Sequence, residues 1–168
     1  MQLMIDIETL DTRVTAKVLS IGYCLFKKTG LYASHVWKLN IDEQDDRTVS
    51  QSTLDFWLSQ SDEARNALLA VKTTPLETIR REIKSMLSFF NVSAVWTNGP
   101  DFDTAILNSL FGEQLWPFYI NRCFRTLRDL CPKKFEEPRT GLHSAKDDAV
   151  YQARAAIFYQ AELGYIKD

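Results

Sequence analysis

The stretch Met4-Ile5-Asp6-Ile7-Glu8, close to the start of the chain, alternates apolar and acidic side chains. Alternation with a period of two is typical of a β-strand, in which neighbouring side chains point to opposite faces. Asp6 and Glu8 therefore share one face of this strand. Two carboxylates on one face repel each other and resist burial. The stretch indicates either an edge strand with a solvated acidic face or a site for divalent cations, which would offset both charges.

The first forty residues predict an antiparallel β-meander. Runs rich in apolar, β-branched and aromatic residues cover residues 3–7, 18–26 and 34–40. A polar segment that ends in glycine, residues 27–30, joins the second and third runs. Glycine is favoured in such a turn because it adopts positive φ without a steric penalty.

Beyond residue 50 the apolar residues recur at helical spacing, three or four residues apart. Helices are expected near residues 52–58, 61–69, 74–90, 101–110 and 144–163, with a shorter one around residue 127. Asp101 is expected to cap the fourth of them. Short strands are expected at residues 92–97 and 118–121. This order predicts an α/β fold with a central mixed five-stranded sheet, which begins with the antiparallel meander and is flanked by helices.

The composition is that of a globular chain of one domain, residues 1–168. Of its 168 residues, 45% are apolar and 12% aromatic, which is enough to build a core. No run approaches about 18 consecutive apolar residues, so we expect neither a membrane span nor a signal peptide. Cys24, Cys123 and Cys131 are widely spaced and odd in number. This favours reduced thiols over disulfides or a zinc site, and a cytoplasmic location.

Two further segments place functional side chains at the start of predicted helices. In Asn98-Gly99-Pro100-Asp101-Phe102-Asp103, one acid would be enough to stabilise the helix N-terminus, so Asp103 is an additional carboxylate. The segment His143-Ser144-Ala145-Lys146-Asp147-Asp148-Ala149 places His143 just before the last helix and Asp148 near its start. Each segment is ordinary by itself, but both could contribute to the same site as the acidic strand.

Taken in order, these segments resemble the motifs of the DEDDh exonucleases, which belong to the ribonuclease H-like superfamily. The motifs are D-x-E-T at residues 6–9, N-x-x-D-F-D at 98–103 and H-x-A-x-x-D-A at 143–149. The resemblance therefore extends over most of the chain. Within the superfamily, residues 53–65 are most similar to the phage exonuclease A and small exoribonuclease AS group.

The resemblance implies a ribonuclease H-like fold and a metal-dependent 3′–5′ exonuclease. In similar enzymes the four acids of these motifs hold two divalent cations and the histidine is the general base. The corresponding residues here are Asp6, Glu8, Asp103 and Asp148, with His143 as the base. Ligands that are all oxygen favour Mg²⁺ or Mn²⁺ over zinc. Two such cations offset charge on the attacking and leaving oxygens of a phosphodiester, and imidazole titrates close enough to neutral pH to accept a proton.

The implied substrate is single-stranded nucleic acid with a free 3′ end, from which nucleoside 5′-monophosphates are released. DNA is the expected substrate; the alternatives are a 3′–5′ exoribonuclease of the same family, a ribonuclease H-type endonuclease and a noncatalytic nucleic-acid-binding protein. The formal net charge of −2 disfavours extensive phosphate neutralisation. Two divalent cations would change it to +2, which agrees with local binding at a strand end. The resemblance also implies a homodimer and a bacterial or phage-infected host cytosol.

Five further residues are expected to contact the substrate: Thr9, Leu10, Trp57, Asn98 and Phe102. In similar enzymes the segment after the acid pair touches the terminal nucleotide, here Thr9 and Leu10. Trp57 would stack on a base, a contact worth ~1–3 kcal/mol, and Asn98 would hydrogen-bond a phosphate. The alternatives are a place in the core for Leu10 and Trp57, and a turn closed by Asn98.

Basic side chains gather in residues 122–139, where six stand against three acidic ones. They are Arg122, Arg125, Arg128, Lys133, Lys134 and Arg139. This surplus would guide a nucleic-acid backbone or support a dimer, and the alternative is a solvated loop.

Overall fold

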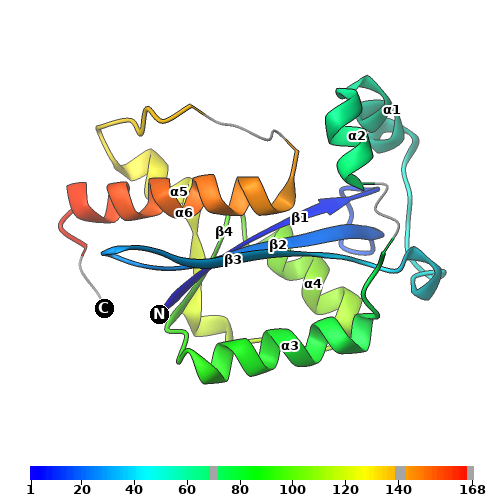
Figure 1. Ribbon diagram of the computed structural model, residues 1–168, viewed down its shortest axis with the longest axis horizontal. Coiled ribbons are helices and arrows are strands. Elements are labelled where there is room, and N and C mark those ends of the chain that lie inside the picture. Colours follow the sequence, from blue (N-terminus) through cyan, green and yellow to red (C-terminus); the bar gives the residue numbers. More distant parts are fainter. Residues whose placement is uncertain (69–71, 139–142, 166–168) are drawn as a thin grey trace.

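A computed structural model describes residues 1–68, 72–138 and 143–165 of the chain, and its centre is a five-stranded sheet (Figure 1). The strands are β1 (Gln2–Thr9), β2 (Val18–Lys27), β3 (Gly30–Lys38), β4 (Ala94–Thr97) and β5 (Asn121–Cys123). Their order in the sheet is β3-β2-β1-β4-β5. The pairs β1–β2 and β2–β3 are antiparallel, whereas β1–β4 and β4–β5 are parallel. The predicted mixed sheet with an N-terminal antiparallel meander is confirmed.

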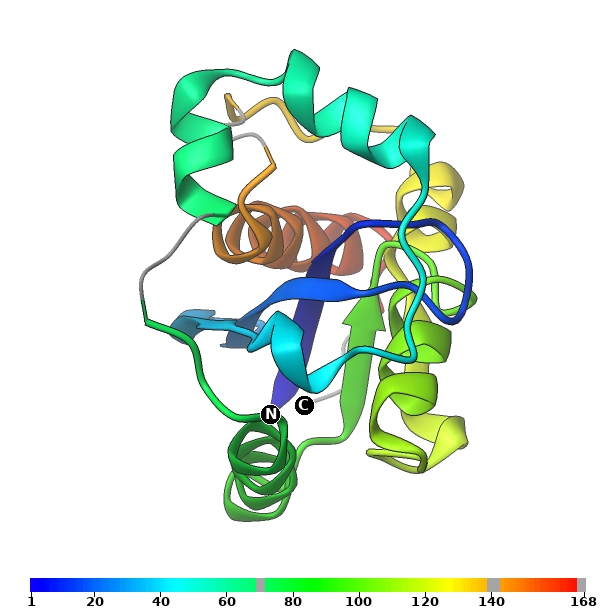
Figure 2. The same ribbon diagram turned by 90° about the vertical axis from the view of Figure 1, so that its right-hand side faces the viewer.

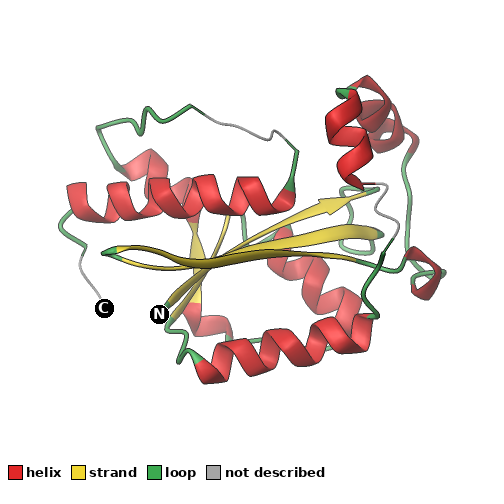
Figure 3. Cartoon of the chain, viewed as in Figure 1, coloured by secondary structure: helices red, strands yellow, loops and turns green. Residues whose placement is uncertain are grey.

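Helices cover both faces of this sheet (Figures 1 and 3). They are α1 (Gln51–Ser59), α2 (Asp62–Leu68), α3 (Leu76–Phe89), α4 (Asp103–Phe111), α5 (Phe124–Leu130) and α6 (Ala145–Glu162), with 3₁₀ turns at Ile41–Glu43 and Phe118–Ile120. Helices α3 and α4 lie on one face, and α5 and α6 on the other, while α1 and α2 lie beyond one end of the strands. Figure 2 shows this end of the molecule, with α6 and α3 on opposite sides of the strands. None of the described helices is both long and apolar enough to cross a membrane.

The alternation of β1 divides its side chains between two apolar clusters. Ile5 and Ile7 pack with residues of α3 and α4, including Ile79. Met4 belongs to the opposite cluster, together with Ala149 of α6. Because Asp6 and Glu8 share the face of Met4, the two acids point toward the side of the sheet that α6 covers.

Gly22 allows α6 to approach the sheet closely. It pairs with Asp6 in the register of β1 and β2. A Cβ atom at this position would lie 2.1 Å from the carbonyl carbon of Ala145, the first residue of α6. A glycine is therefore required where the backbone of α6 rests on β2, and this contact sets the start of α6 beside the acids of β1.

Three local expectations differ from the structure. The strand expected at 118–121 is wrong: a 3₁₀ turn occupies 118–120, and pairing with β4 defines β5 at Asn121–Cys123. The third strand begins and ends earlier than 34–40, because β3 pairs with β2 from Gly30 onward. Asp101 does not cap α4, because the backbone first forms a turn in which the Phe102 N–H donates to the Gly99 carbonyl. The helix therefore begins at Asp103.

Candidate active site

Acidic residues from separate segments meet at one edge of the sheet. Since β1 and β4 run parallel, their carboxyl ends lie at the same edge, with α6 beginning above it. Asp6 and Glu8 of β1 and Asp148 of α6 each offer a carboxylate oxygen, and these oxygens lie within 4.8 Å of one another. Asp103, the first residue of α4, is only 4% exposed. The structure therefore brings together three of the predicted ligands, with the fourth next to them.

The environment of Asp6 disfavours its negative charge. Burial raises the pKa of its carboxyl group well above the usual value, and the charges of Asp103, Glu8 and Asp148 raise it further. The side-chain amide of Gln152 acts in the opposite direction, since its Nε2 donates to Asp6 Oδ1 at 2.8 Å. Asp6 is thus a carboxylate surrounded by other carboxylates, which is the environment that a bound cation would stabilise.

The pKa of Asp103 is also raised. Burial raises its pKa to about 7, although hydrogen bonds from backbone groups and the positive charge of Arg125 oppose the shift. Two acids at this edge therefore hold protons more tightly than ordinary aspartates do.

The donor set fits hard divalent cations. Asp6, Glu8, Asp103 and Asp148 offer oxygen atoms alone, as Mg²⁺ and Mn²⁺ prefer. Gln152 adds a buried side-chain oxygen, Oε1, that has no hydrogen-bond partner among the described residues. An acidic cluster with raised pKa values and an unsatisfied oxygen beside it matches a cation site better than a structural ion pair.

The ring of His143 lies against two aromatic side chains of α1. Its ring meets that of Phe56 edge to face, with 5.0 Å between centroids, and that of Trp57 at 6.1 Å. The backbone at His143 has φ 62°, a left-handed conformation that non-glycine residues rarely adopt. Two aromatic rings and an unusual backbone thus define the position of the imidazole immediately before α6.

A cavity of about 400 Å³ adjoins the acids on the α1 side. Its lining includes Glu8, Thr9, Phe56, Trp57 and Phe102. Trp57 is only 6% exposed, and its Nε1 donates to the Thr9 carbonyl at 2.9 Å. The indole therefore supports the end of β1 and forms a wall of the cavity. Three predicted substrate contacts, Thr9, Trp57 and Phe102, share this cavity with a predicted metal ligand.

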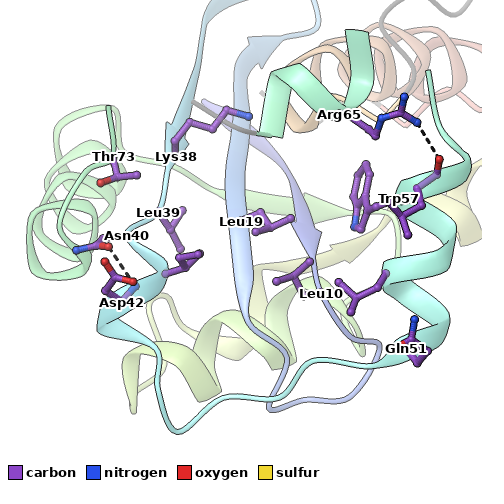
Figure 4. A pocket seen from close by; sticks show the side chains of 13 residues that line it. Leu10, Leu19, Lys38, Leu39, Asn40, Asp42, Gln51, Trp57, Arg65 and Thr73 are labelled. Atoms are coloured by element: carbon purple, nitrogen blue, oxygen red, sulfur yellow. Dashed lines mark hydrogen bonds between the residues drawn. The ribbon is translucent and has the colours of Figure 1, made fainter. Parts of the chain in front are cut away.

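A larger cavity of about 790 Å³ lies behind Trp57, between α1 and the ends of β2 and β3 (Figure 4). Leu10 points into it together with Leu19 and Leu39, and Lys38 lies at its edge. Leu10 therefore lies apart from the cavity that contains Thr9. Asn98, the remaining predicted contact, is half-buried in the loop after β4 and lines neither cavity.

A family model agrees with this geometry. The Rv2179c-like 3′-5′ exoribonuclease domain matches residues 1–160. The chain belongs to this family. Membership makes it a 3′–5′ exonuclease, and the resemblance to DEDDh exonucleases is confirmed. The narrower similarity to the phage exonuclease A group stays a prediction.

Solved structures share the fold at low sequence identity. The nuclease domain of 3′hExo, a DEDDh family member bound to rAMP, superposes with a TM-score of 0.59 at 10% identity. The alignment covers 96% of this chain and 92% of that one. Exonuclease X in complex with 5′ overhanging duplex DNA gives 0.61 at 17% identity, covering 99% and 95%. No curated protein matches the chain. The ribonuclease H-like fold of this exonuclease is thereby confirmed.

Three residues at the site were not singled out from the sequence. Gln152 stands four residues after Asp148, one helical turn away, and this spacing would have revealed it. Phe56 precedes Trp57 but carries no signal of a contact with a histidine more than eighty residues away. Gly22 could not have been found, since its role depends on the packing of α6.

Proposed function

We propose that this exonuclease hydrolyses the terminal phosphodiester bond at the 3′ end of single-stranded nucleic acid and releases nucleoside 5′-monophosphates. Asp6, Glu8, Asp103 and Asp148 would hold two divalent cations, Mg²⁺ or Mn²⁺, and His143 is the general base. The observation that carries the proposal is the convergence of carboxylate oxygens from β1 and α6 within 4.8 Å, beside the buried Asp103.

The protein side chains prepare this site before substrate arrives. Gln152 orients the Asp6 carboxylate through its 2.8 Å hydrogen bond, and the Gly22 contact sets the position of α6 and hence of Asp148. When bound, the cations would neutralise the carboxylates and stabilise the charge that develops on the phosphate in the transition state.

His143 is proposed to take the proton from the attacking water. Its ring borders Phe56, which lines the small cavity together with Glu8. An imidazole next to this wall would accept the proton and later release it to water. The edge-to-face contact with Phe56 restricts the ring and so reduces the entropy lost in the reaction.

The small cavity is proposed to hold the terminal nucleoside, in contact with Thr9, Trp57 and Phe102. We propose RNA as the substrate, because the matching family is described as an exoribonuclease domain. DNA, the substrate expected from the sequence, is the second candidate, since the similar Exonuclease X structure contains duplex DNA. Discrimination between them depends on contacts with the 2′-hydroxyl.

Parallel digestion of a ribo- and a deoxyribo-oligonucleotide of one sequence tests the function. Both carry a 5′ label and are incubated with Mg²⁺, Mn²⁺ or EDTA. We expect a ladder that shortens from the 3′ end only with metal, and faster on RNA. Asp148→Asn should abolish the ladder, whereas the matched control Asp147→Asn, one residue earlier on α6, should retain it. Internal cuts, or cleavage in EDTA, would contradict the proposal.

Three broader expectations from the sequence also remain proposals: one exonuclease domain over residues 1–168, a homodimer and a cytoplasmic location. Light scattering of the purified protein tests the dimer, for which twice the chain mass is expected.

A further inference from the structure

Three of the basic residues predicted in the 122–139 segment make contacts within the protein, and a fourth, Arg139, lies outside the described residues. Arg122 donates to the carbonyls of Tyr119 and Asn121. Arg128 pairs with the neighbouring Asp129 at 2.9 Å. Lys133, beyond the end of α5, pairs with Glu162 of α6. These cations are engaged within the protein, whereas Arg125 has a different environment.

Arg125 lies at the same edge of the sheet as the acids. It is the second residue of α5, which follows β5, and β5 runs parallel to β4. Its Nη2 stands 3.7 Å from the point that a Cβ atom of Gly99 would occupy. The Gly99 carbonyl in turn accepts a hydrogen bond from the backbone N–H of Asp103 at 3.2 Å. The guanidinium and the first residue of α4 therefore adjoin the same glycine.

The guanidinium is close to the acidic site, but its donors are not used. Its charge lowers the pKa of Asp103 against the effect of burial. Yet the side chain is exposed and, within the described residues, makes no hydrogen bond or ion pair. Asn98, next to Gly99, is half-buried, and its side-chain amide is likewise without a hydrogen bond within the described part of the chain. The donors of Arg125 are thus exposed to solvent near Asp103, and Asn98 precedes the glycine that Arg125 adjoins.

We propose that Arg125, with Asn98 beside it, binds the backbone phosphate immediately 5′ of the bond that is cleaved. The inference rests on the proposed function, in which the terminal nucleoside occupies the small cavity next to Glu8 and Thr9. That cavity lies on the α1 side of the acids, whereas Arg125 lies on the β5 side. A strand bound across the acids from one side to the other brings its next phosphate to Arg125.

The chemistry of the side chain suits this ligand. A guanidinium presents a planar set of donors that matches two phosphate oxygens, and such charge-assisted pairs are stronger than neutral hydrogen bonds. A phosphate, unlike Asp103, can approach from solvent and meet the exposed face of Arg125.

Substrates that differ by one phosphate test the proposal. A dinucleotide contains only the phosphate that is cleaved, whereas a trinucleotide adds the phosphate assigned to Arg125. For Arg125→Ala we expect kcat/KM on the trinucleotide to fall by about 10- to 100-fold, mainly through KM. On the dinucleotide kcat/KM should remain within about twofold of the wild type. Arg125→Lys should recover part of the loss, because it retains the charge without the planar donors.

Arg128→Ala is the matched control, since Arg128 lies on the same helix and is already paired with Asp129. It should leave both substrates unaffected. The melting temperature of Arg125→Ala should equal that of the wild type, because the side chain is exposed. An equal loss of kcat/KM on both substrates would overturn the inference. It would show instead that Arg125 contacts the cleaved phosphate or positions Asp103. No loss on either would also overturn it. If the wild type cleaved neither substrate, the proposed function would fail, and the inference with it.

Discussion

Two groups of carboxylates in the described part of the chain have opposite surroundings. On the α3 side, Glu113 accepts from Arg80 and Lys84, each at 2.6 Å, and Arg80 also pairs with Glu77. These partners lower the pKa values of both glutamates. At the edge of the sheet, the neighbours of Asp6 include three other carboxylates, and its pKa is raised. Acidic side chains thus stabilise the fold in one region and oppose it in the other, where the proposed cations would offset their charge.

The largest expected effect comes from removing the charge of Asp6. Asp6→Asn retains an oxygen to accept from Gln152 but cannot bind a cation as a carboxylate does. We expect nuclease activity to fall by about 10³-fold or more, because the charge compensation is worth several kcal/mol. In EDTA at pH 8, the free energy of unfolding should rise, since a buried charge without a cation is removed.

Glu113→Gln is the control from the other region. It should leave activity unchanged and lower the free energy of unfolding only slightly, as for other exposed ion pairs. Oligonucleotide hydrolysis and urea denaturation measure both effects. If Asp6→Asn and Glu113→Gln changed stability in the same direction, the contrast between the two regions would be refuted.

His143→Ala should reduce kcat by about 10²- to 10⁴-fold, the range typical of losing a general base. Its affinity for Mn²⁺, measured by titration calorimetry, should remain at the wild-type value, because the acids are unchanged. His35→Ala, in the exposed edge strand β3, serves as the control and should retain full activity. Normal turnover by the His143 variant would exclude the role assigned to this residue.

Gly22→Ala should disturb the packing of α6 on the sheet at the active site, although no acidic residue is replaced. The added methyl would meet the backbone of Ala145 and displace the start of α6. We expect a loss of ~1–3 kcal/mol in stability, typical of overpacking, together with reduced activity because Asp148 moves. Gly99→Ala is the control for stability alone, because its added methyl would make only an ordinary contact, with the Arg125 guanidinium at 3.7 Å. A stable and active Gly22 variant would show that α6 does not depend on this approach.

The smallest effect is a pH-dependent change in melting temperature. The pKa of Asp103 is raised to about 7 in the folded protein, whereas an aspartate in an unfolded chain has a pKa of about 4. The metal-free protein therefore binds this proton more tightly when folded, and the resulting stability is lost as the pH rises from about 4 through 7. In EDTA, the melting temperature of the wild type should fall relative to that of Asp103→Asn as the pH rises over this range. Added Mg²⁺ should raise the wild-type melting temperature more at pH 8 than at pH 5; equal shifts would contradict this.

Much of the fold could be predicted from the sequence, because the elements that are long carry a clear periodicity. The β1–β2–β3 meander and the helices α3 and α6 follow from alternation and from helical spacing. The short elements could not be predicted in the same way. The three residues of β5 are a strand only because β4 offers them backbone partners, and a strand of that length has no pattern of its own.

The same distinction holds for the candidate site: some of its features follow from local sequence patterns and others from packing. The sequence by itself predicted Asp6, Glu8, Asp103, His143 and Asp148 as site residues, because their types and spacings resemble the motifs of a known family. Only the tertiary structure decided which residues surround them. Gln152 donates a hydrogen bond to Asp6, the ring of Phe56 packs against that of His143, and the charge of Arg125 acts on Asp103. It also separated Leu10 from the cavity that Thr9 lines. The spacing of residues along the chain determines which side chains share a face of one strand or helix. Contacts between elements depend instead on how the elements pack. The close approach at Gly22, for example, exists only once α6 lies on the sheet.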